Sequence, residues 1–258
     1  MIAAILIGAS GSILPVIQQG AGDGLPYGFH AQALLAALSS DIMLLCVPIL
    51  CALPYTAAFI EDYKSGYIKE YLPRSGKKRY IKGKVLATAL SGGMVLFTGV
   101  MAIYIVFALV FTPMELSPNA GQETDQIADT SGEMEETGEK MPDMGMDMRQ
   151  QTFFMDVLGR AFVFSLSGSL WSLTGALLAS VTLSRYMAYA SPFIVFYVLV
   201  IICERYLKDL YVLNPQEWLK AQDFWPGGMW GIVLLLLELI VLLSIAFSMS
   251  IKRRLAFA

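Results

Sequence analysis

The residue types that carry most enzyme chemistry are scarce in this sequence. The chain has one histidine, His30, in a short polar segment, and three cysteines among 258 residues. Cys46 and Cys51 lie too far apart for a C-x-x-C metal or redox motif. The patterns H-E-x-x-H, G-x-S-x-G and G-x-x-x-x-G-K-[ST] do not occur. We therefore predict no catalytic residue and no cofactor in this chain, and any work against a gradient must draw energy from a partner or an ion.

A group of methionines gives a weak indication of metal binding. Met141, Met144, Met146 and Met148 lie close together in the sequence, and thioether clusters suit soft cations such as Cu(I). The surrounding segment 113–151 is acidic and poor in large apolar residues, which is typical of a loosely ordered loop. We favour this second interpretation, predict no metal site, and keep the four methionines as weak candidates.

One carboxyl group lies in the middle of an apolar run. Glu238 is flanked by leucines on both sides, from Leu234 to Leu239. Ionisable groups inside a membrane are costly and usually face protein or water. Glu238 is therefore either a pathway or proton-linked residue, or a buried group that hydrogen-bonds between helices.

Long apolar blocks must position these residues. Of the chain, 56% is hydrophobic and only 15% is charged, whereas a soluble domain carries about a quarter charged residues. A transmembrane helix needs about 20 apolar residues, and a barrel strand would alternate apolar and polar positions. The sequence thus predicts an all-α integral membrane protein of about six transmembrane helices, at residues 1–17, 35–60, 85–111, 157–183, 187–203 and 228–249.

The first block is only just long enough to cross a membrane. No basic residue precedes it, and a secretory signal would need a positive segment there. We interpret it as a true span and leave open whether the natural chain begins further upstream.

The basic residues set the expected orientation. Eight of the 18 Lys and Arg lie between residues 61 and 84, and three more lie in the tail at 252–254. The segment 113–151 instead holds ten acidic residues against two basic ones. Because cytoplasmic loops are enriched in Lys and Arg, we predict a multi-pass cell-membrane protein with both termini in the cytoplasm and the acidic loop outside.

The fourth block is rich in glycine and hydroxyl residues, with Gly168 and Gly175 on one side of the expected helix. Small residues allow close helix packing, although the same residues could line a polar path. We favour packing.

The segment 61–84 is longer than a connection between two spans requires. It predicts a short amphipathic helix that Gly66 breaks or kinks, and a turn at Pro73 and Gly76 that leads into a basic run. The helix would carry three tyrosines on one face: Tyr63, Tyr67 and Tyr71. A charged and aromatic surface of this kind suits docking of a soluble partner.

This segment resembles the loop after the second span in permease subunits of type-2 ABC transporters. That loop carries an acidic residue, then Gly followed by any residue and Ile or Leu, and then a Leu and spaced basic residues. The matching features here are Glu61 or Asp62, Gly66-Tyr67-Ile68-Lys69, Leu72-Pro73-Arg74, Arg79 and Lys84. Six spans, inside termini and a short basic tail also match.

The resemblance implies a coupling helix between spans two and three that inserts into a groove of a separate cytoplasmic ATPase. That partner would hold ATP and Mg, and a second permease chain, identical or not, would complete the pore. Glu61 and Asp62 would pair with basic groups of the ATPase, and Tyr63 and Tyr67 would fill its groove. The implied coupling residues are Glu61, Asp62, Tyr63, Gly66, Tyr67, Lys69, Arg74 and Arg79. The same residues could instead cap the second span and lie at the membrane interface.

The resulting expectation is an ABC permease subunit of the exporter type, whose substrate the sequence does not select. The alternative is a membrane anchor or sensor subunit that recruits a cytoplasmic partner without transport. A secondary transporter is weaker, because the chain has no visible internal repeat. Membrane lipid is an expected partner, because the basic loop could rest against anionic headgroups. Nucleic acid is not an expected partner.

Overall fold

The computed structural model describes residues 34, 38, 41–68, 70, 76–111, 144–206, 213–218 and 228–256. Within these ranges the chain is helical and has no strand, which confirms the all-α prediction. The helices are α3 (Asp41–Ala52), α4 (Ala58–Lys64), α6 (Lys77–Phe111), α7 (Met144–Thr182), α8 (Arg185–Tyr206) and α9 (Gly228–Ala256).

Four of the described helices are long and apolar enough to cross a membrane: Lys77–Leu109, Phe154–Thr182, Arg185–Tyr206 and Trp230–Ala256. They coincide with the last four apolar blocks of the sequence. The predicted span 1–17 and most of the acidic loop lie outside the described residues. The count of six spans and the orientation of the termini therefore stay predictions.

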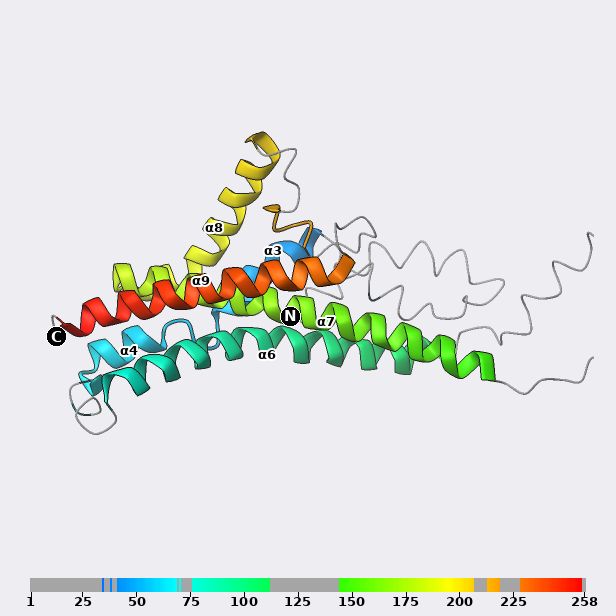
Figure 1. The fold of residues 1–258 in the computed structure, drawn as a ribbon, viewed down its shortest axis with the longest axis horizontal. Coiled ribbons are helices and arrows are strands. Elements are labelled where there is room, and N and C mark those ends of the chain that lie inside the picture. Colours follow the sequence, from blue (N-terminus) through cyan, green and yellow to red (C-terminus); the bar gives the residue numbers. More distant parts are fainter. Residues whose placement is uncertain are drawn as a thin grey trace, which may run out of the picture.

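Helix α7 is the centre of the bundle. It packs against α6, α9, α8, α3 and α4, and of the four long helices it is the most buried and the least apolar. Figure 1 shows α6, α7 and α9 running side by side, while α8 leaves them at a steep angle. A turn at Leu183 and Ser184 joins α7 to α8, with Leu183 in the left-handed region at φ 54°.

Small residues let α6 and α7 approach closely, so the packing interpretation of the fourth block is confirmed. A Cβ atom on Gly92 would lie 2.6 Å from the carbonyl oxygen of Gly168, and one on Gly168 would lie 2.6 Å from that of Gly92. The Ser172 hydroxyl donates a hydrogen bond of 3.0 Å to the Thr88 carbonyl across this contact. Gly175, one heptad further on, instead faces Thr56 and the start of α8.

The helix boundaries differ from the expected blocks at three places. The basic run is not a loop but the first turns of α6, which begins at Lys77, and α7 begins at Met144, inside the expected acidic loop. The block 35–60 is interrupted, because α3 ends at Ala52 and a turn that contains Pro54 precedes α4. Proline disfavours helical geometry in the residue before it.

The buried residues form one cluster along the bundle, a second at one of its ends, and a small third one of Ala57, Ile60, Ala179 and Ala188. In the first, Trp171 of α7 lies edge-on to Phe196 of α8, with ring centroids 5.3 Å apart. The second joins α4, the start of α6 and the ends of α7 and α9, through residues such as Phe59, Ile81 and Phe247.

Candidate functional site

One end of the bundle gathers most of the described basic residues. The start of α6, the α7–α8 turn, the last turns of α9 and the helix α4 meet there (Figure 1). We call this region the basic end. Its described basic residues are Lys64, Lys77, Lys78, Arg79, Lys82, Lys84, Arg185, Lys252, Arg253 and Arg254.

Helix α4 is short and ends at a glycine. The Ser65 amide donates to the Glu61 carbonyl at 2.9 Å, and Gly66 follows with φ +77°. This left-handed conformation is readily adopted by glycine and ends a helix cleanly. The structure therefore confirms the predicted helix break at Gly66.

The inner face of α4 is part of the core. Phe59 is 3% exposed and lies edge-on to Phe247 of α9, with centroids 6.5 Å apart, and Ile60 is buried beside α7 and α8. Tyr63, four residues after Phe59, packs on the same cluster with its ring 6.2 Å from that of Phe59. The predicted role of Tyr63 in filling a partner's groove is untested, but in this chain the ring already has a core contact.

A polar cluster joins α4 to α6. Lys84 Nζ lies 2.8 Å from Asp62 Oδ2, and the Tyr80 hydroxyl donates to the same carboxylate oxygen at 2.8 Å. Lys84 also donates to the Tyr55 hydroxyl at 3.0 Å, and its Nζ lies 4.8 Å from the centre of the Tyr55 ring. We call Tyr55, Asp62, Tyr80 and Lys84 the Asp62 cluster.

The Asp62 cluster is largely shielded from solvent, since the side chains of Lys84 and Asp62 are 12% and 21% exposed. Charge-assisted hydrogen bonds in such surroundings are stronger than neutral ones. The cluster therefore fixes α4 to α6. Asp62, which the resemblance assigns to ATPase contact, already has two donors within this chain.

The outer surface of α4 carries charged and aromatic groups that face solvent. Glu61 Oε1 lies 4.0 Å from Arg185 Nε, and both side chains are more than half exposed. Exposed pairs of this kind contribute little to stability. Tyr67 and Arg79 are also exposed and line a pocket of about 420 Å³ beside the Asp62 cluster. Of the predicted coupling residues, the fold exposes Glu61, Tyr67 and Arg79. Two others, Lys69 and Arg74, lie outside the described residues.

Glu238 is exposed on α9, among the exposed side chains of Leu234, Leu237 and Val241. No described residue gives its carboxyl group the interhelical hydrogen bond that one interpretation of the sequence expects. Within this chain it therefore faces the surroundings of the bundle. The pathway interpretation is not tested by this placement.

The methionine candidates fall mostly beyond the described side chains. Met141 lies outside the described residues, and Met144, Met146 and Met148 belong to the first turns of α7, of which only the backbone is described. Among the described residues, no group of three His, Cys, Asp or Glu is arranged to hold a metal ion.

Sequence reasoning found neither Tyr55 nor Tyr80 of the Asp62 cluster, and it named Lys84 only as part of the resemblance. Tyr80 and Lys84 are four residues apart on α6 and so share a helix face, a spacing that could have indicated a joint role. Tyr55 follows a proline in the turn before α4, and nothing in the sequence pairs it with Lys84.

Comparison with known proteins assigns no family: no family model matches the chain, and no curated protein and no solved structure matches it.

Proposed function

We propose that this chain is the membrane permease subunit of an ATP-driven ABC transporter of the exporter type, working with a separate cytoplasmic ATPase. The observation that carries the proposal is the attachment of α4. Its inner face is fixed to the long helices, while its outer surface exposes Glu61 and leaves Tyr67 and Arg79 accessible beside it.

The attachment supports a mechanical role for α4. Phe59 links it to α9, Ile60 links it to α7 and α8, and the Asp62 cluster links it to α6. Interfaces that are packed in this way respond to force as units rather than deforming continuously. A partner that moves α4 would therefore move the long helices with it, which is the task of a coupling helix.

The exposed carboxyl of Glu238 supports a pore built from two chains. An ionisable group in the middle of a spanning helix is costly when lipid surrounds it. We therefore expect a second permease chain, identical or not, to cover this part of α9. Glu238 would then lie between the two chains or beside the path of the substrate.

The sequence supports an external energy source, because the chain lacks a P-loop pattern. ATP and Mg would be bound by the ATPase. The substrate class stays open.

Co-purification with mass spectrometry tests the proposal. The tagged chain is isolated from its native host in mild detergent, and Glu61→Lys is compared with Lys252→Glu, a charge reversal at the same end of the bundle but on α9. We expect an ABC ATPase to accompany the unaltered chain and the Lys252 variant, and to be lost from the Glu61 variant.

Absence of an ATPase from the intact, folded chain would overturn the proposal. If a different cytoplasmic protein co-purified with the chain, and its binding was lost in Glu61→Lys, the anchor or sensor function would replace the permease function.

A further inference from the structure

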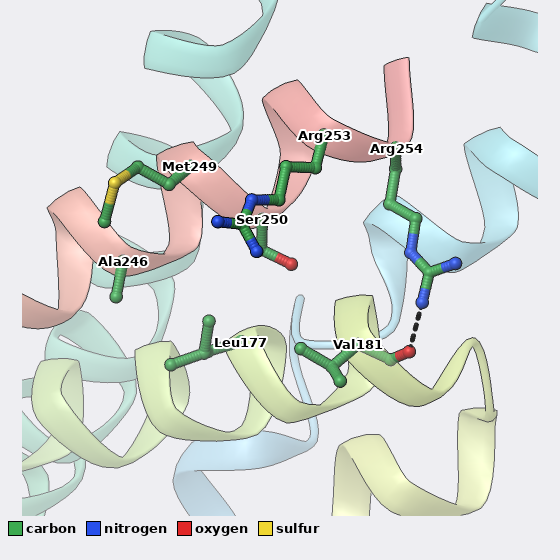
Figure 2. Close-up of a pocket in the computed structure, with 7 residues that line it drawn as sticks. All are labelled: Leu177, Val181, Ala246, Met249, Ser250, Arg253 and Arg254. Atoms are coloured by element: carbon green, nitrogen blue, oxygen red, sulfur yellow. Dashed lines mark hydrogen bonds between the residues drawn. The ribbon is translucent and has the colours of Figure 1, made fainter. Parts of the chain in front are cut away.

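A groove runs between the last turns of α7 and α9 at the basic end. It has a volume of about 480 Å³ and is lined by Leu177, Val181, Ala246, Met249, Ser250, Arg253 and Arg254. Figure 2 shows side chains from both helices facing the space between them, with Arg253 folded back along α9 toward Ser250. We call it the α7–α9 groove.

Most polar groups of this groove already have partners. The Ser250 hydroxyl shares a hydrogen bond of 2.7 Å with that of Ser180, and the Arg254 guanidinium donates to the Val181 carbonyl (Figure 2). Arg253 is exposed, no residue that lines the groove is acidic, and no described carboxylate pairs with Arg253. The groove therefore combines an apolar wall with two cations that lack a counter-charge among the described residues, and Arg253 has no hydrogen-bond partner among those residues either.

The groove lies where two apolar helices end together. Arg253 and Arg254 are in the last turn of α9, and Val181 is in the last turn of α7. Ala246, Met249, Ser250 and Arg253 share one face of α9, so the groove extends about 10 Å along that helix. Its apolar part lies between the two long apolar helices, and its cations lie in the last turn of α9, where a membrane-spanning helix would meet the lipid headgroups.

We propose that the α7–α9 groove binds an anionic membrane phospholipid. Arg253 holds the phosphate, and one acyl chain lies against Leu177, Ala246 and Met249. Basic pockets between helix ends are suited to anionic headgroups, and the guanidinium fork suits the phosphate oxygens. This inference does not depend on the ABC transporter proposal.

The shape of the groove favours a lipid over a free anion. A free phosphate would meet only the cations and leave the wall formed by Leu177, Ala246 and Met249 uncovered. A phospholipid uses both parts, since burial of its methylene groups adds to the charge pairing. The groove therefore fits an amphiphile with a negatively charged headgroup better than a free anion.

Native mass spectrometry of the detergent-purified full chain tests the proposal. The probes are dioleoyl phosphatidylglycerol, dioleoyl phosphatidylcholine with the same acyl chains, and inorganic phosphate. Arg253→Gln removes one of the two cations and is matched with Lys252→Gln, the adjacent exposed cation outside the groove. Ala246→Phe fills the apolar part and is matched with Ile245→Phe, which enlarges an exposed side chain outside it.

We expect the phosphatidylglycerol to bind more tightly than phosphatidylcholine and to survive mild activation, while inorganic phosphate is not retained. Arg253→Gln should weaken its binding about fivefold, the factor that one cation near an anionic surface contributes. Ala246→Phe should also weaken it, and both control variants should bind as the unaltered chain does.

Three results would overturn the proposal: equal retention of the two lipids, equal loss in Lys252→Gln and Arg253→Gln, or unchanged binding in Ala246→Phe. Retention of inorganic phosphate alone would assign Arg253 to a free anion and would also overturn it. Arg253→Lys, which keeps the charge, and the circular dichroism spectrum of each variant separate loss of binding from loss of folding.

Discussion

Replacing Asp62 by asparagine should loosen α4 from the bundle without changing the shape of the side chain. The carboxylate accepts two hydrogen bonds of 2.8 Å, from Lys84 and Tyr80. A hydrogen bond to a charged group contributes about 1.5–3 kcal/mol, and a neutral one about 0.5–1.5. Asp62→Asn makes the Tyr80 bond neutral and removes the charge pairing from the Lys84 bond, whose ammonium donor stays charged, so the expected loss is about 2 kcal/mol in the free energy that holds α4 against α6.

The Lys84 side chain sets the upper limit of this effect. It is 12% exposed and keeps the Tyr55 hydroxyl as a partner in the variant. Breaking a fully buried ion pair costs about 3–5 kcal/mol, so water access and Tyr55 together reduce the loss to the smaller figure.

Hydrogen exchange in detergent measures the opening directly. The amides of Glu61 and Ser65 are hydrogen-bonded within α4, and a loss of about 2 kcal/mol in opening free energy raises their exchange about 30-fold. Glu61→Gln is the matched control, because its pair with Arg185 is exposed and worth about 0–1 kcal/mol. In a Lys84→Met background, Asp62→Asn should have a smaller effect, since the charge partner is already gone.

Equal amide exchange in Asp62→Asn and Glu61→Gln would contradict this role of the Asp62 carboxylate. So would an effect of Asp62→Asn that is the same with Lys84 present and absent. Either result would mean that the Asp62 cluster does not fix α4 to α6.

Three further predictions concern the packing of the long helices. In a thermal unfolding assay, Gly92→Ala should lower the stability by about 2 kcal/mol, because the added Cβ would lie 2.6 Å from the Gly168 carbonyl oxygen of α7. Gly83→Ala should be neutral or slightly stabilising in the same assay, because nothing lies within 4 Å of the added Cβ. Ser180→Ala and Ser250→Ala should each cost about 1 kcal/mol, and the double variant should cost less than their sum, whereas strict additivity would exclude the 2.7 Å bond between them. Glu238→Leu should leave the unfolding temperature of the single chain unchanged, since the side chain is exposed, but lower the cross-linked dimer fraction in membranes; an unchanged dimer would argue against a second chain over Glu238.

The long helices could be predicted from the sequence because a helix that crosses a bilayer must be apolar along most of its length. A run of about 20 apolar residues has few structural alternatives, and the blocks that correspond to α6, α7, α8 and α9 are all of this kind. The Gly168 contact was also predictable, since small residues on one side of an apolar helix favour close packing.

The basic end was harder to predict because its residues act in pairs from distant parts of the chain. Asp62 and Lys84 both lie in a run of charged residues, where a solvated side chain and an interior ion pair have the same sequence signature. The pattern placed Tyr63 and Tyr67 on one face, yet Tyr63 packs on Phe59 and Tyr67 is 48% exposed. Their difference follows from the break at Gly66, which lies between them in the left-handed region and ends the shared helix face.

The α7–α9 groove had no sequence signal. Its walls come from residues near 180 and near 250, and only the fold brings the two helix ends together. The exposure of Glu238 was likewise undetermined, because α9 is apolar on all sides and its sequence does not mark a core face.

The central position of α7 has a consequence for how the chain is made. A nascent helix that is less apolar than its neighbours enters a bilayer poorly by itself, and α7 is the least apolar of the four long helices. Its close contact with α6, which leaves the ribosome first, offers its glycine and serine surface a protein partner instead of lipid. The short turn at Leu183 then brings α8 in directly behind it, so α7 and α8 would enter the membrane as one hairpin, after α6 is already in place.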